Sequence, residues 1–225
     1  MMPVFRILIV LLVPIWGFSQ KSFQFDYMLT YENVYVQKDS LKDTTVYLTN
    51  AADNSYFISL KDISHTEYEL TFTQHDMIRA QVKINKTAFL ANKYLNVVCS
   101  HVSNHKNTVK KVANNYQFTA VMDTIINNNT YASYSLKPTY STKKRLKHKA
   151  GTNLYIINTQ IPHLPMFTHP TAYEKWLSEK RLPHGIPVKK CFKDEKNELY
   201  NCETLIRFSS VNKQLVLTGN CAHLE

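Results

Sequence analysis

Residues 182–208 have the sequence LPHGIPVKKCFKDEKNELYNCETLIRF and contain two of the four cysteines of the chain. Two apolar-rich runs flank the polar block 194–198, as is typical of two β-strands joined by a tight turn. A turn centred in the middle of this block places Cys191 directly opposite Cys202. The segment therefore predicts a β-hairpin that is closed by a disulfide.

The same register makes two further pairs on one face of the hairpin. It sets Lys190 opposite Glu203, a charge pair, and Val188 opposite Leu205, an apolar pair. Directly opposed strand residues lie about 4.5 to 5.5 Å apart at Cα, which is within the range that a disulfide requires. Three pairings thus favour one register. The alternative is that Cys191 and Cys202 are unrelated thiols that form no disulfide with each other.

Residues 1–19 predict a secretory signal peptide. Arg6 precedes an apolar run at 7–15, and small residues stand at the minus-three and minus-one positions before Gln20. The run is shorter than the roughly 20 residues of a membrane-spanning helix, and no cysteine stands at the cleavage site for a lipid anchor. We therefore expect a periplasmic or secreted protein that is not transmembrane, with residues 20–225 forming a single β-rich domain.

Export to an oxidising compartment makes Cys99, Cys191, Cys202 and Cys221 a disulfide set. Four cysteines allow three connectivities. The hairpin register favours Cys191 with Cys202, which leaves Cys99 with Cys221. No C-x-x-C spacing occurs, so the sequence predicts no metal site at the cysteines, and nothing in it indicates a cofactor.

Short alternating segments separated by turn residues predict a mainly β fold. Apolar and polar residues alternate at 67–73, for example, and the segments up to residue 84 are separated by breaks that include Lys42-Asp43, Asp53-Asn54 and His75-Asp76. The predicted strands are 23–36, 44–49, 56–60, 67–73, 77–84, a strand from 94, 117–126, 131–136 and 153–158. Residues 86–92 are expected to be helix or loop, and the first five strands to form an antiparallel meander.

The clearest helix is predicted at 172–181. Thr171 and Glu174 have the spacing of a capping box, and Tyr173 and Trp176 belong to an apolar stripe. Both aromatic residues are candidate ligand contacts, with core packing against the sheet as the alternative.

The order of these elements resembles the ending of periplasmic lipoprotein-carrier (LolA-like) proteins, in which strands are followed by a helix, a turn and a hairpin. The turn that contains Gly185-Ile186-Pro187-Val188 leads into this hairpin. The stretch Leu182-Pro183-His184-Gly185-Ile186 is also similar to the Gly-Leu-Pro-Gly-Leu-Ile turn of the GLPGLI family of secreted bacterial proteins, with His184 inserted between proline and glycine. The resemblance is confined to the C-terminal helix, turn and hairpin. It implies an incurved antiparallel sheet, or half-barrel, with one or two packed helices and a concave face that can admit acyl chains.

The chain is basic, with a formal charge of +10 that falls by one when Arg6 is removed with the signal peptide. Charge of this kind favours anionic surfaces such as acidic glycans and lipid head groups. Export and the lack of a binding motif argue against nucleic acid. The densest basic run, for which an unpartnered exposed loop is the alternative, predicts anionic-surface binding by Lys143, Lys144, Arg145, Lys147 and Lys149.

Histidines provide the remaining candidate chemistry. His163, His169 and His184 surround the predicted helix and could ligate zinc or transfer protons, although their spacing matches no zinc signature. His101 and His105 would lie roughly 13 Å apart in a strand, which is the favoured interpretation and is too far for one metal ion. In a helix the two side chains would meet. Because the short motifs of common enzyme classes are also missing, we expect that the protein is not an enzyme.

The sequence therefore favours an exported binding protein whose concave sheet holds a lipid or another apolar or amphipathic ligand. The alternative is a cell-envelope interaction protein that binds an anionic glycan or a protein through its basic, tyrosine-rich surface. An enzyme of unfamiliar type centred on the three histidines ranks third. An apolar cavity would favour the first hypothesis, whereas a completely filled core would favour the second.

Overall fold

The computed structural model describes residues 21–36, 41–75, 78–104, 109–219 and 221. The signal peptide predicted at 1–19 and His105 lie outside the described residues. The strands are β1 (Ser22–Tyr35), β2 (Leu41–Thr49), β3 (Tyr56–Asp62), β4 (Glu67–Gln74), β5 (Ile78–Asn85), β6 (Tyr94–Val98), β7 (Val102–Asn104), β8 (Tyr116–Ile126), β9 (Asn129–Pro138), β10 (Thr152–Asn158), β11 (Ile186–Lys193) and β12 (Leu199–Thr218). The helices are α1 (Lys86–Ala91), the 3-10 helix η1 (Cys99–His101), α2 (Lys110–Ala113), α3 (Thr142–Lys147) and α4 (Pro170–Glu179).

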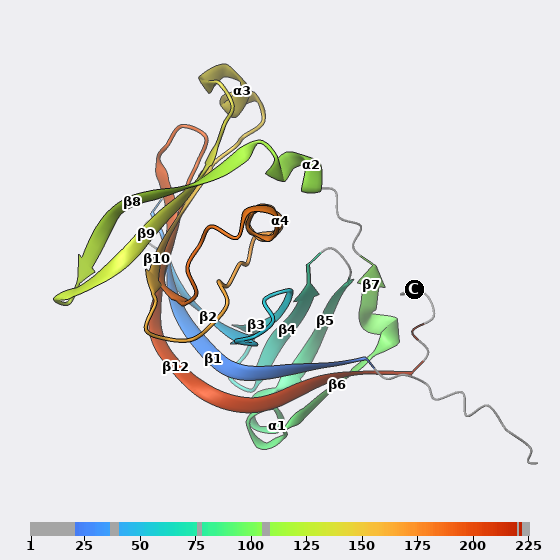
Figure 1. The fold of residues 1–225 in the computed structure, drawn as a ribbon. Coiled ribbons are helices and arrows are strands. Elements are labelled where there is room, and N and C mark those ends of the chain that lie inside the picture. Colours follow the sequence, from blue (N-terminus) through green and yellow to red (C-terminus); the bar gives the residue numbers. More distant parts are fainter. Residues whose placement is uncertain (1–20, 37–40, 76–77, 105–108, 220, 222–225) are drawn as a thin grey trace, which may run out of the picture.

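The strands of the described residues form one 12-stranded sheet in the order β7-β5-β4-β3-β2-β1-β12-β11-β10-β9-β8, with β6 paired to β12 beside this path. Strands β1 to β5 are the antiparallel meander that alternation predicts, and within the described ranges only β6 runs parallel to its partner. The sheet bends so that β8–β10 and β3–β5 rise on opposite sides of α4 (Figure 1). The predicted fold class, a mainly β, incurved antiparallel sheet with few helices, is confirmed.

One face of β3–β5 is apolar and belongs to the largest core. Ile58, Leu70 and Phe72 point to this face because they occupy alternate positions in their strands. They pack in one cluster with Leu95 of β6 and Leu215 of β12. The opposite, largely polar face of the same strands therefore remains free to line the concave side of the sheet.

The hairpin forms with the predicted register in its central part. Cys191 pairs with Cys202, and Lys190 pairs with Glu203. The Val188–Leu205 pair is not among the partners, because the β11–β12 ladder begins at Lys189 and Val188 lies at a bulge of β11 against β10. The neighbouring residue is a proline, which has no N–H to donate to a ladder.

Both predicted disulfides are confirmed. Cys191 and Cys202 are joined with their Cα atoms 4.1 Å apart, and Cys99 and Cys221 are joined at 5.3 Å. The second bridge closes a sequence separation of 122 residues and attaches the end of the chain to the largest core, which contains Cys99.

The start of the main helix differs from its prediction. Thr171 is the second helical residue, and the N-cap is His169, whose ring accepts a hydrogen bond from the Thr171 N–H at 3.3 Å. Pro170 occupies the first helical position, where its fixed φ suits the helix and its missing N–H costs nothing. Lys180, in the left-handed conformation, ends the helix.

Two smaller segments, around α1 and α3, also differ in how well the sequence predicted them. Residues 86–92 are largely helical as α1, and the strand from Tyr94 forms as β6. The basic run 143–149 lies mainly in the short helix α3, so its interpretation as a loop was wrong for most of its length, although all of its residues except Arg145 are exposed. Helix propensity explains this result, because lysine, arginine and leucine are good helix formers.

Candidate functional site

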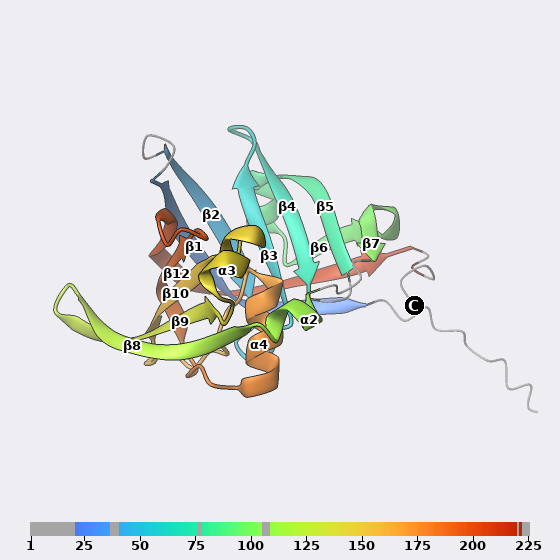
Figure 2. The ribbon, with the colours of Figure 1, turned by 90° about the horizontal axis from the view of Figure 1, so that it is seen from above.

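A cleft of about 400 Å³ lies on the concave side of the sheet, between strands β2–β5 and the N-terminal end of α4. Thr168 and Pro170 form its wall at the helix, and Val109, which precedes α2, contributes a further contact. Figure 2 shows α4 near the lower ends of β3 and β4 when the molecule is seen from above. The curvature of the sheet and the position of the helix therefore create the cleft together.

The cleft has a mixed lining. Its aromatic part consists of Tyr47 and Phe57, whose ring centroids lie 6.1 Å apart in an edge-to-face arrangement. The other side chains that β2–β5 contribute are mainly hydroxyl, amide or charged groups. They are Thr45, Ser59, Lys61, Glu69, Thr71, Thr73, Gln74, Ile78 and Arg79, and His75, the residue after β4, also lines the cleft.

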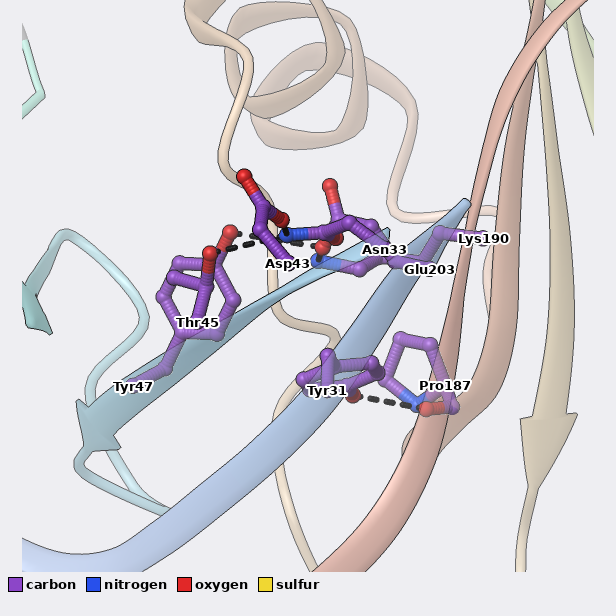
Figure 3. Close-up of polar contacts among 8 residues, drawn as sticks. All are labelled: Tyr31, Asn33, Asp43, Thr45, Tyr47, Pro187, Lys190 and Glu203. Carbon is purple, nitrogen blue, oxygen red and sulfur yellow. Dashed lines mark hydrogen bonds and ion pairs between the residues drawn. The ribbon is translucent and has the colours of Figure 1, made fainter. Parts of the chain in front are cut away.

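A polar cluster adjoins the cleft where β1, β2, β11 and β12 meet (Figure 3). The Lys190 Nζ lies 2.5 Å from a carboxylate oxygen of Glu203, and the Tyr47 hydroxyl donates to the same carboxylate at 3.3 Å. The Lys190 ammonium also lies 4.4 Å from the ring centroid of Tyr31 and 4.6 Å from that of Tyr47. The buried positive charge is thus compensated by one carboxylate and two aromatic faces.

Asn33 forms the second part of this cluster. Its side-chain amide donates to Asp43 at 2.5 Å and to the Thr45 hydroxyl at 2.9 Å. Only 4% of Asn33 is exposed, and its Oδ1 has no hydrogen-bond partner among the described residues. Tyr47 and Thr45 both line the cleft, so the polar cluster is linked to the cleft through their hydroxyls.

The tyrosines of this region act as neutral hydrogen-bond donors. Burial raises the pKa of Tyr31 well above its ordinary value, and the negative charge of Glu203 adds to this effect. The pKa of Tyr47 is raised well above the ordinary value for the same two reasons. The Tyr31 hydroxyl donates to the Pro187 carbonyl at 2.7 Å. These phenols are therefore poorly suited to act as general bases.

Sequence reasoning missed His75, which lines the cleft. Its ring stacks on Tyr173 with centroids 4.4 Å apart, and its Nε2 lies 3.0 Å from the Phe167 carbonyl. Burial lowers the pKa of His75 to about 4. The imidazole is consequently neutral at pH 7 and donates a hydrogen bond to that carbonyl.

The three histidines proposed from the sequence have separate structural environments. His163 is buried with its Nε2 2.9 Å from the Thr49 hydroxyl, His169 caps α4, and His184 is exposed. His101 is exposed in η1. Among the described residues, no group of three or more histidine, cysteine, aspartate or glutamate side chains is placed to hold a metal ion.

The predicted ligand contacts lie in the core. Trp176 and Tyr173 are 4% and 8% exposed, and they pack with Phe167, Phe118 and other residues between α4 and β8–β10. Neither lines the cleft. The polar residues of each alternating strand, such as Glu69, were the sequence signal that could have identified the lining of the cleft. Alternation alone, however, does not tell which face of the sheet a helix covers.

The basic run is placed at the end of the molecule, on α3 above β8–β10 (Figure 1). Lys143, Lys144, Lys147 and Lys149 are exposed. Arg145 is half-buried and donates to the Asp194 carbonyl at 3.2 Å. Four of the five predicted anion-binding residues therefore face water. No helix in the described part of the chain has the length and apolarity needed to cross a membrane.

No family model and no curated protein matches the sequence. Among solved structures, the chain is similar to the Pseudomonas aeruginosa MucA/MucB complex, with 8% identity and a TM-score of 0.43 over 89% of this chain and 55% of that one. The chain thus spans about half the length of that structure.

Two further structures are described as lipoprotein-sorting or LolA-type proteins. One is a putative outer membrane lipoprotein-sorting protein domain from Vibrio parahaemolyticus, with 12% identity and a TM-score of 0.33 over 82% of this chain and 85% of that chain. The other is the LolA superfamily protein NE2245 from Nitrosomonas europaea, with 12% identity and a TM-score of 0.27 over 90% and 89%. Likeness at these scores decides nothing about ligand or activity.

Proposed function

We propose that the protein is an exported, non-enzymatic binding protein that takes an amphipathic ligand into the cleft between β2–β5 and α4. The observation that carries this proposal is the cleft itself, about 400 Å³ of space with both aromatic and polar walls. Ligand sites of proteins are concave, have volumes of roughly 300 to 1,000 Å³, and combine apolar surface with a few polar groups. The two disulfides support a location in the periplasm or outside the cell, because disulfides persist in oxidising compartments.

The lining also limits the kind of ligand. A wholly apolar molecule would bury the side chains of Lys61 and Glu69 against hydrocarbon, which is unfavourable for charged groups. An amphipathic molecule can set its apolar part against Tyr47 and Phe57 and its polar part against the remaining lining. Because the lining contains both aromatic and charged side chains, we do not propose a carrier of bare acyl chains.

The test is native mass spectrometry of the protein purified from its own envelope, followed by extraction of any bound molecule. We expect a bound mass that survives 1 M salt, because contacts inside a cleft are screened much less than contacts between exposed charges. Ser59→Trp, which fills the cleft, should abolish retention, whereas Thr119→Trp on the exposed side of β8 should not. Retention that is equal in both variants would contradict the proposal.

A second function is favoured by the exposed lysines of α3 and the residue that follows it. A cell-envelope interaction protein would use Lys143, Lys144, Lys147 and Lys149 to bind an anionic surface. Binding to phosphatidylglycerol vesicles should then weaken strongly between 0.1 M and 1 M salt, as the Debye length falls from about 10 Å to about 3 Å. Changing these four lysines to glutamine should abolish it. Changing four other exposed lysines, Lys21, Lys83, Lys137 and Lys196, should have a smaller effect, and equal effects would reject a specific role for α3.

The other hypotheses drawn from the sequence have less support than these two functions. The resemblance to the GLPGLI turn, for which no family model matches, concerns architecture and names no ligand. Ligand contact by Trp176 or Tyr173 would require α4 to move away from the sheet, since both residues are buried beneath it. No catalytic role is proposed for any residue.

A further inference from the structure

We infer that the ligand of the cleft is a saccharide, whose hydroxyl groups pair with the hydroxyl-bearing floor formed by β2, β3 and β4. This inference rests on the proposed function, because it concerns the same cleft and names the chemical class of its ligand. It is separate from the predicted binding of anionic glycans by the basic surface, since the residues involved lie on the concave face of the sheet.

Hydroxyl groups are arranged in rows across the floor. Tyr47 on β2 is directly opposite Ser59 on β3, which is in turn opposite Thr71 on β4. The next row along the strands contains Phe57 and Thr73, which are also directly paired. Neighbouring strands lie about 4.8 Å apart, and residues two positions apart on one strand lie about 6.6 Å apart. The floor is therefore a regular grid of polar groups beside two aromatic rings.

These polar groups are available to a ligand. The side chains of Ser59, Thr71 and Thr73 have no hydrogen bond to another described residue, although all three line the cleft. The Oε1 of Gln74, which also lines the cleft, is buried and lacks a partner within the described part of the chain. A hydroxyl both donates and accepts hydrogen bonds, so a ligand that is rich in hydroxyls can satisfy every one of these groups.

The same groups discriminate against an acyl chain. Covering a hydroxyl without giving it a partner costs more free energy than the burial of one methylene group gains. With three unpaired hydroxyls, an orphan amide oxygen and the charges of Lys61 and Glu69 in the lining, hydrocarbon would gain little. A sugar ring instead presents hydroxyls at its edge and C–H groups on its face, which suit the grid and the rings of Tyr47 and Phe57.

The charges of the lining fit an uncharged saccharide. Lys61 and Glu69 are directly opposite each other on β3 and β4, so their charges largely compensate. His75 adds no positive charge at neutral pH, because burial of its imidazole disfavours the protonated form. Arg79 is the cation that remains, and it is exposed.

The test uses isosteric substitutions whose effects have opposite signs for the two ligand classes. Thr71→Val replaces a hydroxyl by a methyl group of the same shape, and Ser59→Ala removes a second hydroxyl in the same row. Binding is measured by saturation-transfer NMR and titration calorimetry with a panel of cellotetraose, maltotetraose and chitotetraose, and in parallel with palmitate and lysophosphatidylcholine. Thr119→Val, on exposed β8, is the matched control.

We expect at least one oligosaccharide to bind, and Thr71→Val to weaken it about five- to tenfold, the usual loss for one hydrogen bond. The double variant should weaken it further, and the control should bind like the original protein. If palmitate or lysophosphatidylcholine binds while the oligosaccharides do not, and Thr71→Val strengthens that binding, the saccharide inference is overturned and the proposed function stands. If neither class binds the folded protein, both are overturned.

Discussion

Lys190 and Glu203 face each other on directly paired strands, with 2.5 Å between the ammonium and the carboxylate, and both side chains are mostly buried. Their pairing follows from the hairpin register, but their burial comes from the rings of Tyr31 on β1 and Tyr47 on β2. The pair therefore connects the disulfide-closed hairpin to the wall of the cleft through the Tyr47 hydroxyl.

This arrangement predicts a strong asymmetry between single and double substitutions. Glu203→Gln leaves the Lys190 charge buried without its partner and should lower the free energy of unfolding by on the order of 3 kcal/mol. Replacing both residues, as Lys190→Met with Glu203→Leu, should cost much less, because no uncompensated charge remains. Urea unfolding followed by circular dichroism measures both. A double variant as unstable as Glu203→Gln would show that the pair does more than neutralise a buried charge.

The two disulfides should differ in their contribution to stability. In the chain-entropy description, a bridge stabilises by restricting the unfolded chain, and the effect grows with the length of the loop that it closes. The Cys191–Cys202 bridge spans a separation of 11 residues and the Cys99–Cys221 bridge a separation of 122. Replacing the first pair by alanine should cost about 3 kcal/mol, and replacing the second about 4 to 5 kcal/mol. Denaturant midpoints that reverse this order would contradict the prediction.

His75 predicts that stability decreases in mild acid. Its pKa is lowered from an ordinary value of 6.5 to about 4 because the ring is buried. Between pH 4 and pH 6.5 the unfolded chain binds more protons than the folded protein, so the free energy of unfolding rises with pH. Above pH 6.5, His75 is neutral in both states and no longer makes the free energy of unfolding depend on pH. Acidification from pH 7 to pH 4 should remove up to about 3 kcal/mol. Burial also lowers the pKa of His163, which acts in the same direction.

The measurement compares urea unfolding at pH 7 and pH 4.5. His75→Gln keeps a donor for the Phe167 carbonyl but cannot titrate in this range, so the difference between the two pH values should become smaller. His65→Gln, at an exposed position, serves as the control and should leave the difference unchanged. If His75→Gln retains the full pH dependence, another group is responsible for it.

The sequence by itself determined the local arrangements. A short polar turn and the two-residue period of a strand decided that Cys191 faces Cys202, and elimination then identified the second bridge. Alternation also located the meander, since each strand has one apolar face that must be buried. The exact start of α4 was missed by two residues, although Pro170 at the first helical position is a signal that the sequence contains.

Only the tertiary structure decided which polar residues surround the cleft. Alternation separates Ser59 and Thr71 from the apolar side of their strands, but it does not reveal that the sheet curves and that α4 covers part of this face. The neighbours of Lys190 were equally hidden, because Tyr31 and Tyr47 are more than a hundred residues earlier in the chain. Contacts of this kind depend on how distant strands are brought together, and no local period or turn encodes that closure.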